Sequence, residues 1–283
     1  MVTRVISEHR IRQAVIDAIG EIFCRPDPEV LEALIRASEQ ETEALPRDVL
    51  NTIIQNAEIA AREGIPICQD TGTLVVFAEI GNQVIIDGNP IRDIIESAAA
   101  EAWQQYYLRR STVEEPLFDR MIESIKVPCV LHIDIVSGDK LRLRFALKGG
   151  GAENMSRHAM LQPGAGRDTI LAFVLQTVLD AGGKACPPLI VGIGIGGNFE
   201  RCAILSKQAL MLPFYFRHPD PQYRKLEEEI ITRINLEGCG AQGLGGSTTA
   251  LAVHIISEPC HIASLPVAVN LDCHAHRSLG IEI

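Results

Sequence analysis

The feature that most constrains the fold is an alternation of apolar and polar side chains across residues 130–147. Ile133 and Ile135 alternate with polar neighbours, and the pattern resumes at Leu141 and Phe145 after the polar segment SGDK. A two-residue period is typical of strands with one buried face, and a short glycine-containing segment between two such runs predicts a hairpin. We therefore expect an antiparallel β-hairpin here.

Helical periodicity dominates residues 1–63. Asp27 and Pro28 are expected to begin one helix, as its N-cap and first residue, and Gly64 to end another. The β-branched run TLVVFAEI then predicts a buried strand from Thr73. Further helices are expected at 168–181, 199–211 and 222–236, and further strands at 84–86, 188–195 and 250–256. These segments predict a mixed α/β (α+β) fold, helix-rich towards its N-terminus with short sheets, in a single domain over residues 1–283.

The charge balance restricts the possible partners. The 283 residues carry a formal net charge of −10, which disfavours nucleic acids and anionic membranes because both attract basic surfaces. No run of about 18 apolar residues is present, so we expect no membrane-spanning helix. The N-terminal segment carries charges throughout and lacks the apolar core of a secretory signal. We therefore expect a cytoplasmic protein whose eight cysteines are reduced.

Three glycines raise the possibility of nucleotide binding. Gly192, Gly194 and Gly197 form a G-x-G-x-x-G pattern between a strand-like and a helix-like segment. The dinucleotide fingerprint also requires an acidic residue about 20 positions further, at the end of a second strand. Here that region reads LPFYFRHPDP, which does not resemble a buried strand. A tight strand-to-helix crossing that needs small residues is the simpler interpretation, and a nucleotide-binding module stays an alternative.

A zinc site near the C-terminus is another alternative. Cys260 and His261 precede the strand-like segment PVAVNL, and Cys273, His274 and His276 follow it. Thiolates and imidazoles suit zinc, but the spacing differs from that of common zinc motifs. A zinc-stabilised, non-enzymatic binding module therefore also stays open.

Three further cysteines occupy polar or glycine-rich boundaries between segments, where a side chain can face a cleft. They are Cys68, Cys186 and Cys273. Three thiolates from separate corners can hold an iron–sulfur cluster, and one iron then stays open as a Lewis acid. Spacing alone does not select these three cysteines from eight, and each taken singly is equally compatible with a buried thiol.

Four segments together resemble the α subunit of the class I, iron–sulfur fumarate hydratases, to which the L-tartrate dehydratase α subunit is a close relative. They are ICQDTGT, KGGGAENMS, ACPPLIVGIGIGG and CHIASLPVAVNLDCHAHR. The segments occur in the family's order, and the resemblance covers nearly the whole chain. It implies a hydro-lyase that interconverts (S)-malate with fumarate and water. It also implies a [4Fe–4S] cluster with three protein ligands and one open iron.

The resemblance also assigns site residues. It identifies the three cluster ligands as Cys68, Cys186 and Cys273, and the substrate-binding residues as Gln69, Asp70, Arg109, Gly151 and His261. Arg109 suits this role because a guanidinium grips a carboxylate with two parallel hydrogen bonds. Asp70 is the expected catalytic residue, which exchanges a proton with the substrate hydroxyl. Without the resemblance, Asp70 would be interpreted as a turn-capping carboxylate.

A partner and a preferred substrate are implied as well. In single-chain members of the family a second domain follows, whereas this chain ends at Ile283. We therefore expect a separate β subunit, an α2β2 assembly, and a base on the β subunit that removes the C3 proton. The loop sequence GGGAENMS resembles fumarate hydratases, so fumarate is expected as the substrate ahead of L-tartrate or another small hydroxydicarboxylate.

Overall fold

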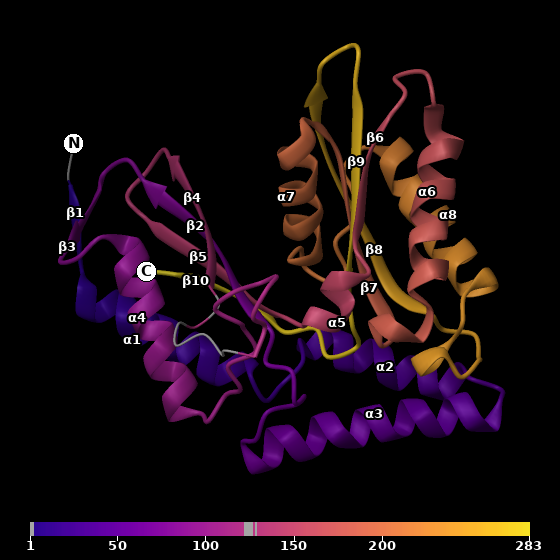
Figure 1. The fold of residues 1–283 in the computed structure, drawn as a ribbon, viewed down its shortest axis with the longest axis horizontal. Helices are drawn as coiled ribbons and strands as arrows, with labels where there is room; N and C mark the ends of the chain where they lie inside the picture. Colours follow the sequence, from indigo (N-terminus) through magenta and orange to yellow (C-terminus); the bar gives the residue numbers. More distant parts are fainter. Residues whose placement is uncertain (1–2, 122–126, 128) are drawn as a thin grey trace. The chain divides into compact units, whose positions relative to one another are not determined.

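The chain forms two compact units in the computed structural model, which describes residues 3–121, 127 and 129–283. The first unit comprises Met1–Asp27, Ala57–Gly149 and Arg277–Ile283, and the second comprises Pro28–Asn56 and Gly150–His276. Both units mix helices with strands, which confirms the expected mixed α/β fold (Figure 1). The expectation of a single domain over residues 1–283 stays a prediction. Among the described helices, none is long and apolar enough to cross a bilayer.

The first unit is built on a four-stranded sheet with the strand order β10-β5-β2-β4, against which α1 and α4 pack. A separate parallel pair joins β1 and β3. Trp103 and Phe145 are the largest fully buried side chains of this core. The elements are β1 (Arg4–Ser7), α1 (Glu8–Ile22), β2 (Thr73–Gly81), β3 (Val84–Asp87), α4 (Ile91–Gln105), β4 (Cys129–Val136), β5 (Leu141–Lys148) and β10 (Ser278–Glu282).

The predicted hairpin over residues 130–147 is wrong in its pairing. β4 and β5 form as strands, but β2 lies between them, parallel to β4 and antiparallel to β5. The connection steps over the end of β2, where the Gly81 N–H donates to the Lys140 carbonyl at 2.9 Å. Alternation predicts which face of a strand is buried, but it does not identify the neighbouring strand. β4 is an edge strand, and its Ile135 is 77% exposed.

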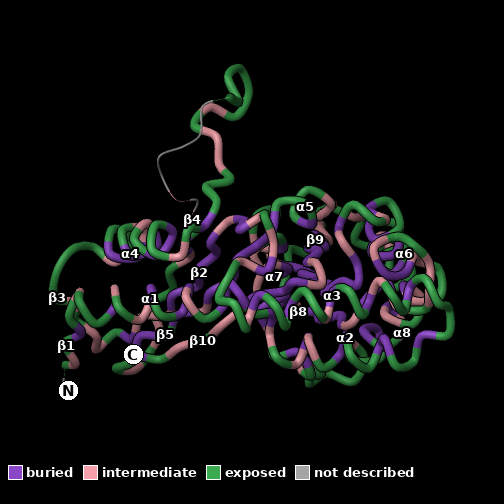
Figure 2. The backbone as a smooth tube through the Cα atoms, turned by 90° about the horizontal axis from the view of Figure 1, so that it is seen from below, coloured by how far each residue is buried: buried purple, intermediate pink, exposed green. Residues whose placement is uncertain are grey.

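The second unit contains a four-stranded sheet with the order β6-β9-β7-β8, covered by α7 on one face and by α6 and α8 on the other (Figure 1). Its central strands are largely buried (Figure 2). The elements are α2 (Pro28–Gln40), α5 (Gly150–Asn154), β6 (Arg157–Leu161), α6 (Gly166–Ala181), β7 (Leu189–Gly197), α7 (Phe199–Leu210), α8 (Pro221–Glu237), β8 (Ala250–Cys260) and β9 (Leu265–Asp272). Helix α3 (Ala44–Glu63) contributes residues to both units, and Gly64 follows it with φ +64°, as expected for a helix stop.

Strand β7 explains the glycine pattern. Val191 and Ile193 belong to the core formed with α6 and α8, whereas the glycines between and after them face α7. A Cβ atom at Gly194 would lie 2.1 Å from the Cys202 carbonyl oxygen, and one at Gly192 would be equally obstructed by the backbone of α7. The glycines therefore let α7 pack directly on the strand, as the simpler interpretation predicts. The space above them is filled by a helix, which argues against a dinucleotide there.

Both four-stranded sheets share one connectivity. In each, a central strand (β2 or β7) is followed by a parallel neighbour (β4 or β8). The next strand (β5 or β9) then returns antiparallel on the other side of the central strand. The turns at residues 137–140 and 261–264 therefore both cross the end of a central strand.

Candidate active site

The corner that carries Cys68 lies in the first unit, between α3 and β2. The Cys68 sulfur accepts the Asp70 N–H at 3.4 Å and lies 3.4 Å from Gln69 Oε1. Asp70 Oδ1 accepts the Gly72 N–H at 2.9 Å. Gly72 has φ +79°, and a Cβ there would lie 2.2 Å from the Lys148 carbonyl oxygen, so only glycine fits. The corner is therefore a defined turn with an N–H group directed at its sulfur, a contact that favours thiolate ligands.

Arg109 lies beside the Cys68 corner. Its N–H donates to Thr71 Oγ1 at 3.1 Å, and its carbonyl accepts the Trp103 indole N–H at 3.3 Å. Thr71 and Trp103 are both buried, whereas the Arg109 side chain is exposed. The backbone of Arg109 is thus fixed while its guanidinium faces outward. The first unit therefore brings together four predicted site residues, namely Cys68, Gln69, Asp70 and Arg109.

Two buried cations that were not predicted from the sequence lie beside this corner. Lys148 and Arg277 are each 2% exposed. Arg277 Nη2 donates to the Asp70 carbonyl at 3.3 Å, while its Nε has no hydrogen-bond partner among the described residues. Lys148 Nζ donates to the Gly149 carbonyl at 3.2 Å. Buried positive charges favour a nearby anion, so the corner suits a carboxylate ligand. The available signal was a charged residue at one end of each of two matched segments, since Lys148 begins KGGGAENMS and Arg277 ends CHIASLPVAVNLDCHAHR.

The second unit places Cys186 and Cys273 side by side. Cys186 has φ +56° and directly precedes the rigid pair Pro187-Pro188. Its carbonyl accepts the N–H of His274, the residue after Cys273, at 3.3 Å. A Cβ at Gly151 would lie 3.6 Å from the Lys184 carbonyl oxygen, so Gly151 also lies beside this corner. The second unit therefore brings together three predicted site residues.

Hydrogen bonds from Gln242 hold the Cys186 corner in place. The backbone N–H and side-chain amide of Gln242 both donate to the Pro187 carbonyl, at 2.8 and 2.7 Å. The loop that carries Gln242 is fixed in turn by the buried carboxylate of Glu41, which accepts the Ser247 N–H at 2.7 Å and the Ser247 hydroxyl at 3.0 Å. The same carboxylate accepts the N–H groups of Thr42 and Glu43. Burial raises the pKa of Glu41, but these hydrogen bonds outweigh burial and leave the pKa below its ordinary value.

Replacing Glu41 with Gln is expected to lower the free energy of unfolding by about 1–3 kcal/mol, because hydrogen bonds to a buried charge are lost. Since the folded-state pKa is depressed, the carboxylate stabilises the fold above its unfolded-state pKa, and this contribution disappears as the pH falls through the folded-state pKa. The difference between wild type and Glu41→Gln should therefore shrink upon acidification below about pH 4. Urea denaturation across pH 3–7 measures this difference. Glu43→Gln, an exposed neighbour, is the control and should behave like the wild type.

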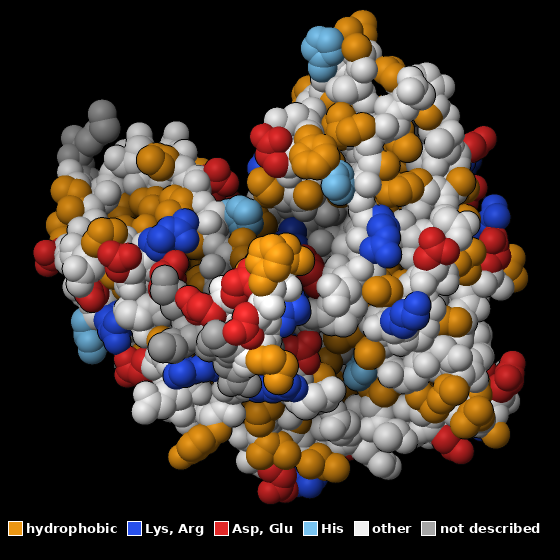
Figure 3. Space-filling model, viewed as in Figure 1, with side chains coloured by type: hydrophobic (Ala, Val, Ile, Leu, Met, Phe, Trp, Pro, Cys, Tyr) orange, Lys and Arg blue, Asp and Glu red, His pale blue; other side chains and the backbone are white. Residues whose placement is uncertain are grey.

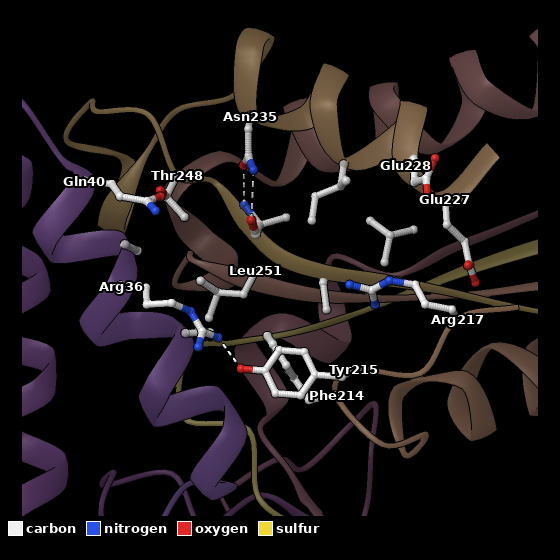
Figure 4. Close-up of a pocket in the computed structure, with 16 residues that line it drawn as sticks. Arg36, Gln40, Phe214, Tyr215, Arg217, Glu227, Glu228, Asn235, Thr248 and Leu251 are labelled. Carbon is white, nitrogen blue, oxygen red and sulfur yellow. Dashed lines mark hydrogen bonds between the residues drawn. The ribbon is translucent and has the colours of Figure 1, made fainter. Parts of the chain in front are cut away.

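Two cavities of the second unit differ in their relation to this corner. One of about 490 Å³ is lined by Gln242 and His274, and so adjoins Cys273, with Asp48, Thr52 and Asn56 from α3. The other, of about 320 Å³, lies between α2, α8 and β8, and Arg36 and Arg217 point into it (Figure 4). None of the predicted site residues lines the second cavity.

His261 lies far from the Cys186 corner. Strand β7 pairs Gly197 with Cys260 at one end and Ile190 with Asp272 at the other. His261 follows Cys260, whereas Cys273 follows Asp272. Gly197 lies seven positions after Ile190 along β7, so His261 and Cys273 are roughly 20 Å apart at about 3.3 Å per residue. A zinc site that combines Cys260 or His261 with Cys273 is therefore excluded within one chain.

His276 is a structural residue. Its Nδ1 lies 2.6 Å from Asp272 Oδ2, and both side chains are buried. This pairing gives His276 a structural role, so His276 is not needed as a ligand of the alternative zinc site. Within residues 3–121, 127 and 129–283, no three His, Cys, Asp or Glu side chains form a group that could hold a metal ion.

The cysteines differ in their surroundings. Cys68, Cys186 and Cys273 are half-buried at chain corners. Burial raises the pKa of Cys129 to about 12, and burial also raises the pKa of Cys202 and Cys239, which disfavours thiolates there. The donor chemistry of the corner cysteines thus fits a cluster with three thiolate ligands. Cys68 belongs to the first unit and the other two to the second, so the complete ligand set stays a prediction.

Comparison with known proteins gives a consistent result. Residues 12–282 match the family described as "Fumarate hydratase (Fumerase)". The chain is 37% identical over 280 residues to the "Putative L(+)-tartrate dehydratase subunit alpha" of Methanocaldococcus jannaschii, covering 95% of each chain. It is 30% identical over 273 residues to the L(+)-tartrate dehydratase subunit alpha of Escherichia coli strain K12, covering 95% of this chain and 89% of the relative. The relative of the same name from Shigella sonnei gives the same values.

Proposed function

The chain belongs to the fumarate hydratase (Fumerase) family. From this premise we propose that it acts as a hydro-lyase α subunit of the class I, iron–sulfur type. Its substrate is a small dicarboxylate with a hydroxyl group. The observation that carries the proposal is the gathering of the matched residues into two corners. Cys68, Gln69, Asp70 and Arg109 meet in one unit, and Gly151, Cys186 and Cys273 meet in the other.

L(+)-Tartrate is the substrate we propose. The relatives that match along nearly the whole chain are named for tartrate, which favours tartrate over the fumarate expected from the sequence. In this reaction a C–O bond breaks at one carbon and a C–H bond at the next, so tartrate gives water and the enol form of oxaloacetate. Fumarate hydration to (S)-malate is the second candidate, which the loop sequence GGGAENMS favours.

Cys68, Cys186 and Cys273 would hold the [4Fe–4S] cluster. When bound, such a cluster supplies a Lewis acid that makes the hydroxyl of the substrate a better leaving group. The chain contributes the rigidity of both corners. Gly72 fixes the first corner, and Gln242 fixes the second through the Pro187 carbonyl.

The substrate carboxylates would be held by positive and hydrogen-bonding groups of the chain. The exposed guanidinium of Arg109 can grip one carboxylate with two parallel hydrogen bonds. The buried charges of Lys148 and Arg277 stabilise negative charge near Asp70. Gln69 and the Gly151 backbone add polar contacts, and His261 is proposed as a further carboxylate ligand. Together these groups orient the substrate for elimination.

Asp70 would exchange the proton of the departing hydroxyl group. Its Oδ1 is held by the Gly72 N–H, which keeps the carboxylate in one orientation. The base that takes the C3 proton is proposed to lie on a β subunit, since the relatives are named as α subunits. The working enzyme would then be an α2β2 assembly.

Turnover by the anaerobically purified α and β complex tests the function. L-Tartrate, (S)-malate and fumarate are offered separately, and loss of substrate and formation of oxaloacetate, fumarate or malate are measured. Tartrate turnover with the highest kcat/KM supports the proposal, and preferred turnover of malate and fumarate supports the second candidate. No turnover of any of the three by an iron-loaded complex contradicts both.

Replacing Arg109 with Ala is expected to raise KM for the dicarboxylate about 10- to 100-fold, because a charge-assisted hydrogen bond pair is lost. Arg109→Lys should recover only part of the loss, since an ammonium lacks the planar fork. The adjacent exposed residue offers a matched control, Arg110→Ala, which should leave KM near the wild-type value. Equal effects of the two alanine substitutions would contradict the assignment of Arg109.

A further inference from the structure

The cavity between α2, α8 and β8 lies at an open edge of the second sheet. Strand β8 ends the strand order β6-β9-β7-β8, so one side of its backbone has no neighbouring strand among the described residues. The cavity has a volume of about 320 Å³ and is lined by residues 250–253 of β8. All of its lining residues belong to the second unit. A cavity of this size can hold a small molecule.

Side chains of α8 take the place of the missing strand at both ends of this stretch. Asn235 Oδ1 accepts the N–H groups of Thr249 and Ala250, both at 2.8 Å, and its Nδ2 donates to the Ala250 carbonyl at 3.0 Å (Figure 4). Glu227 Oε1 accepts the Ile255 N–H at 2.8 Å. Such contacts prevent another strand from pairing along the whole edge. A short window of strand backbone lies between them, beside the cavity.

The backbone of Val253 faces this window. Successive residues of a strand direct their N–H and carbonyl groups to opposite sides, and β8 pairs regularly with β7 over residues 252–255. Val253 lies two residues before Ile255, so its N–H and carbonyl face the same way as the Ile255 N–H. Val253 also lines the cavity. Its N–H is therefore placed to donate to a ligand there.

Two guanidiniums point into the same cavity, that of Arg36 from α2 and that of Arg217 from the segment before α8 (Figure 4). Arg36 Nη2 donates to the Tyr215 hydroxyl, and its guanidinium carbon lies 5.4 Å from the centre of the Tyr215 ring. Arg36 Nη1 lies 3.9 Å from Glu32, and Arg217 Nη1 donates to the Phe216 carbonyl at 2.9 Å. Because a guanidinium has five N–H donors, both arginines keep donors for a ligand.

Two glutamates also line the cavity, and the buried one is engaged by the backbone. Glu227 accepts the Ile255 N–H with Oε1 and the His218 N–H with Oε2, at 2.8 and 3.3 Å. Burial raises the pKa of Glu227, which disfavours its negative charge. Glu228 is exposed.

The grouping of charges favours an anion. On the face shown in Figure 3, basic side chains lie scattered among acidic ones, whereas the cavity brings Arg36 and Arg217 together beside the Val253 N–H. Backbone N–H groups at a sheet edge bind anions, and guanidiniums grip carboxylates and phosphates with parallel hydrogen bonds.

We propose that this cavity is a binding site for a small anion that carries carboxylate or phosphate groups. The Val253 N–H donates to one anionic oxygen, while Arg36 and Arg217 hold the anion from two different walls. Ala33 and Leu251 of the lining cover its carbon atoms. The site is independent of the proposed function, since none of the predicted site residues lines the cavity.

Equilibrium dialysis of labelled succinate and of labelled inorganic phosphate against the anaerobic α and β complex tests the site. All variants carry Arg109→Ala, so that the predicted substrate site contributes little to binding. Arg36→Ala and Arg217→Ala should each raise Kd at least about 10-fold, because a charge-assisted hydrogen bond is lost. Lys225→Ala is the control, since it removes an exposed positive charge of α8 outside the cavity lining. This control should leave Kd unchanged.

A variant that fills the cavity separates local contacts from a general effect of charge. Leu251 is drawn in the cavity between the two arginines (Figure 4). Leu251→Trp keeps every charge and should also raise Kd at least about 10-fold, because the larger side chain occupies the volume of the ligand. Circular dichroism checks that each variant is folded.

One bound anion per α chain, weakened by all three cavity substitutions, supports the site. The anion with the lower Kd then identifies carboxylate or phosphate as the preferred group. Equal Kd values for Arg36→Ala, Arg217→Ala and Lys225→Ala overturn the proposal. So does the failure of both anions to bind below about 10 mM. Turnover is not measured, so failure of the proposed function leaves this result unaffected.

Discussion

Replacing Cys68 with Ser is expected to reduce turnover of the α and β complex at least about 10³-fold, because a Lewis acid worth several kcal/mol is lost with the cluster. The Cys68 corner itself should survive, since its fold depends on Gly72 and on the Asp70 carboxylate. Iron content per α chain and the visible absorption of the purified complex should fall together with activity. Circular dichroism should remain unchanged.

A second cysteine gives the control for this experiment. Cys239 is half-buried, and its sulfur makes a long contact, 3.9 Å, to the Gly240 carbonyl. Cys239→Ser should therefore keep its iron and most of its activity. If Cys68→Ser retained full iron and turnover while the fold was intact, Cys68 would not be a ligand, and the three-cysteine set would have to be abandoned.

Replacing Gly194 with Ala is expected to destabilise the second unit by about 3 kcal/mol or more. The added Cβ would lie 2.1 Å from the Cys202 carbonyl oxygen and 2.6 Å from the Ser206 backbone nitrogen. Both atoms belong to the backbone of α7, so the whole helix would have to move away from β7. Thermal or urea unfolding measures the loss.

Gly164→Ala is the matched control, because a Cβ at Gly164 meets no atom within 4 Å. This substitution should change stability by less than about 0.5 kcal/mol. Were Gly194 part of a nucleotide-binding loop, Ala would weaken retention of NAD and leave stability nearly unchanged. Equal stability of both variants would therefore revive the nucleotide interpretation.

Local patterns predicted the elements of this fold better than their partners. The alternation in residues 130–147 correctly predicted two strands, but β2 lies between them. The alternation of large residues and glycine in β7 correctly predicted a close strand-to-helix crossing, since that packing involves α7, the next element along the chain. Strand neighbours depend on contacts between distant segments, which a periodic pattern does not contain. Short elements such as β1, β6 and α5 gave too few residues for a pattern to appear.

The residues of the candidate site were likewise predictable where local sequence marks them and not where tertiary packing places them. Cys68 and Cys186 stand at segment boundaries, as expected, because glycine and proline mark such corners in a sequence. Lys148 and Arg277 were missed, because their burial follows from tertiary packing around Asp70. The distance between His261 and Cys273 also depends on the register of β7 with its two neighbours, and the twelve positions between them in sequence give no indication of it.

The order of strands in the second sheet sets the minimum length of the turn between β8 and β9, at residues 261–264. Since β7 separates β8 from β9, the chain must bridge two inter-strand gaps, about 9.5 Å, before it can turn back. A tight two-residue turn is too short for that span. The strand order therefore requires a longer turn between β8 and β9. Side chains in the middle of this turn are not covered by the sheet. Shortening this turn would force β9 out of line with β7.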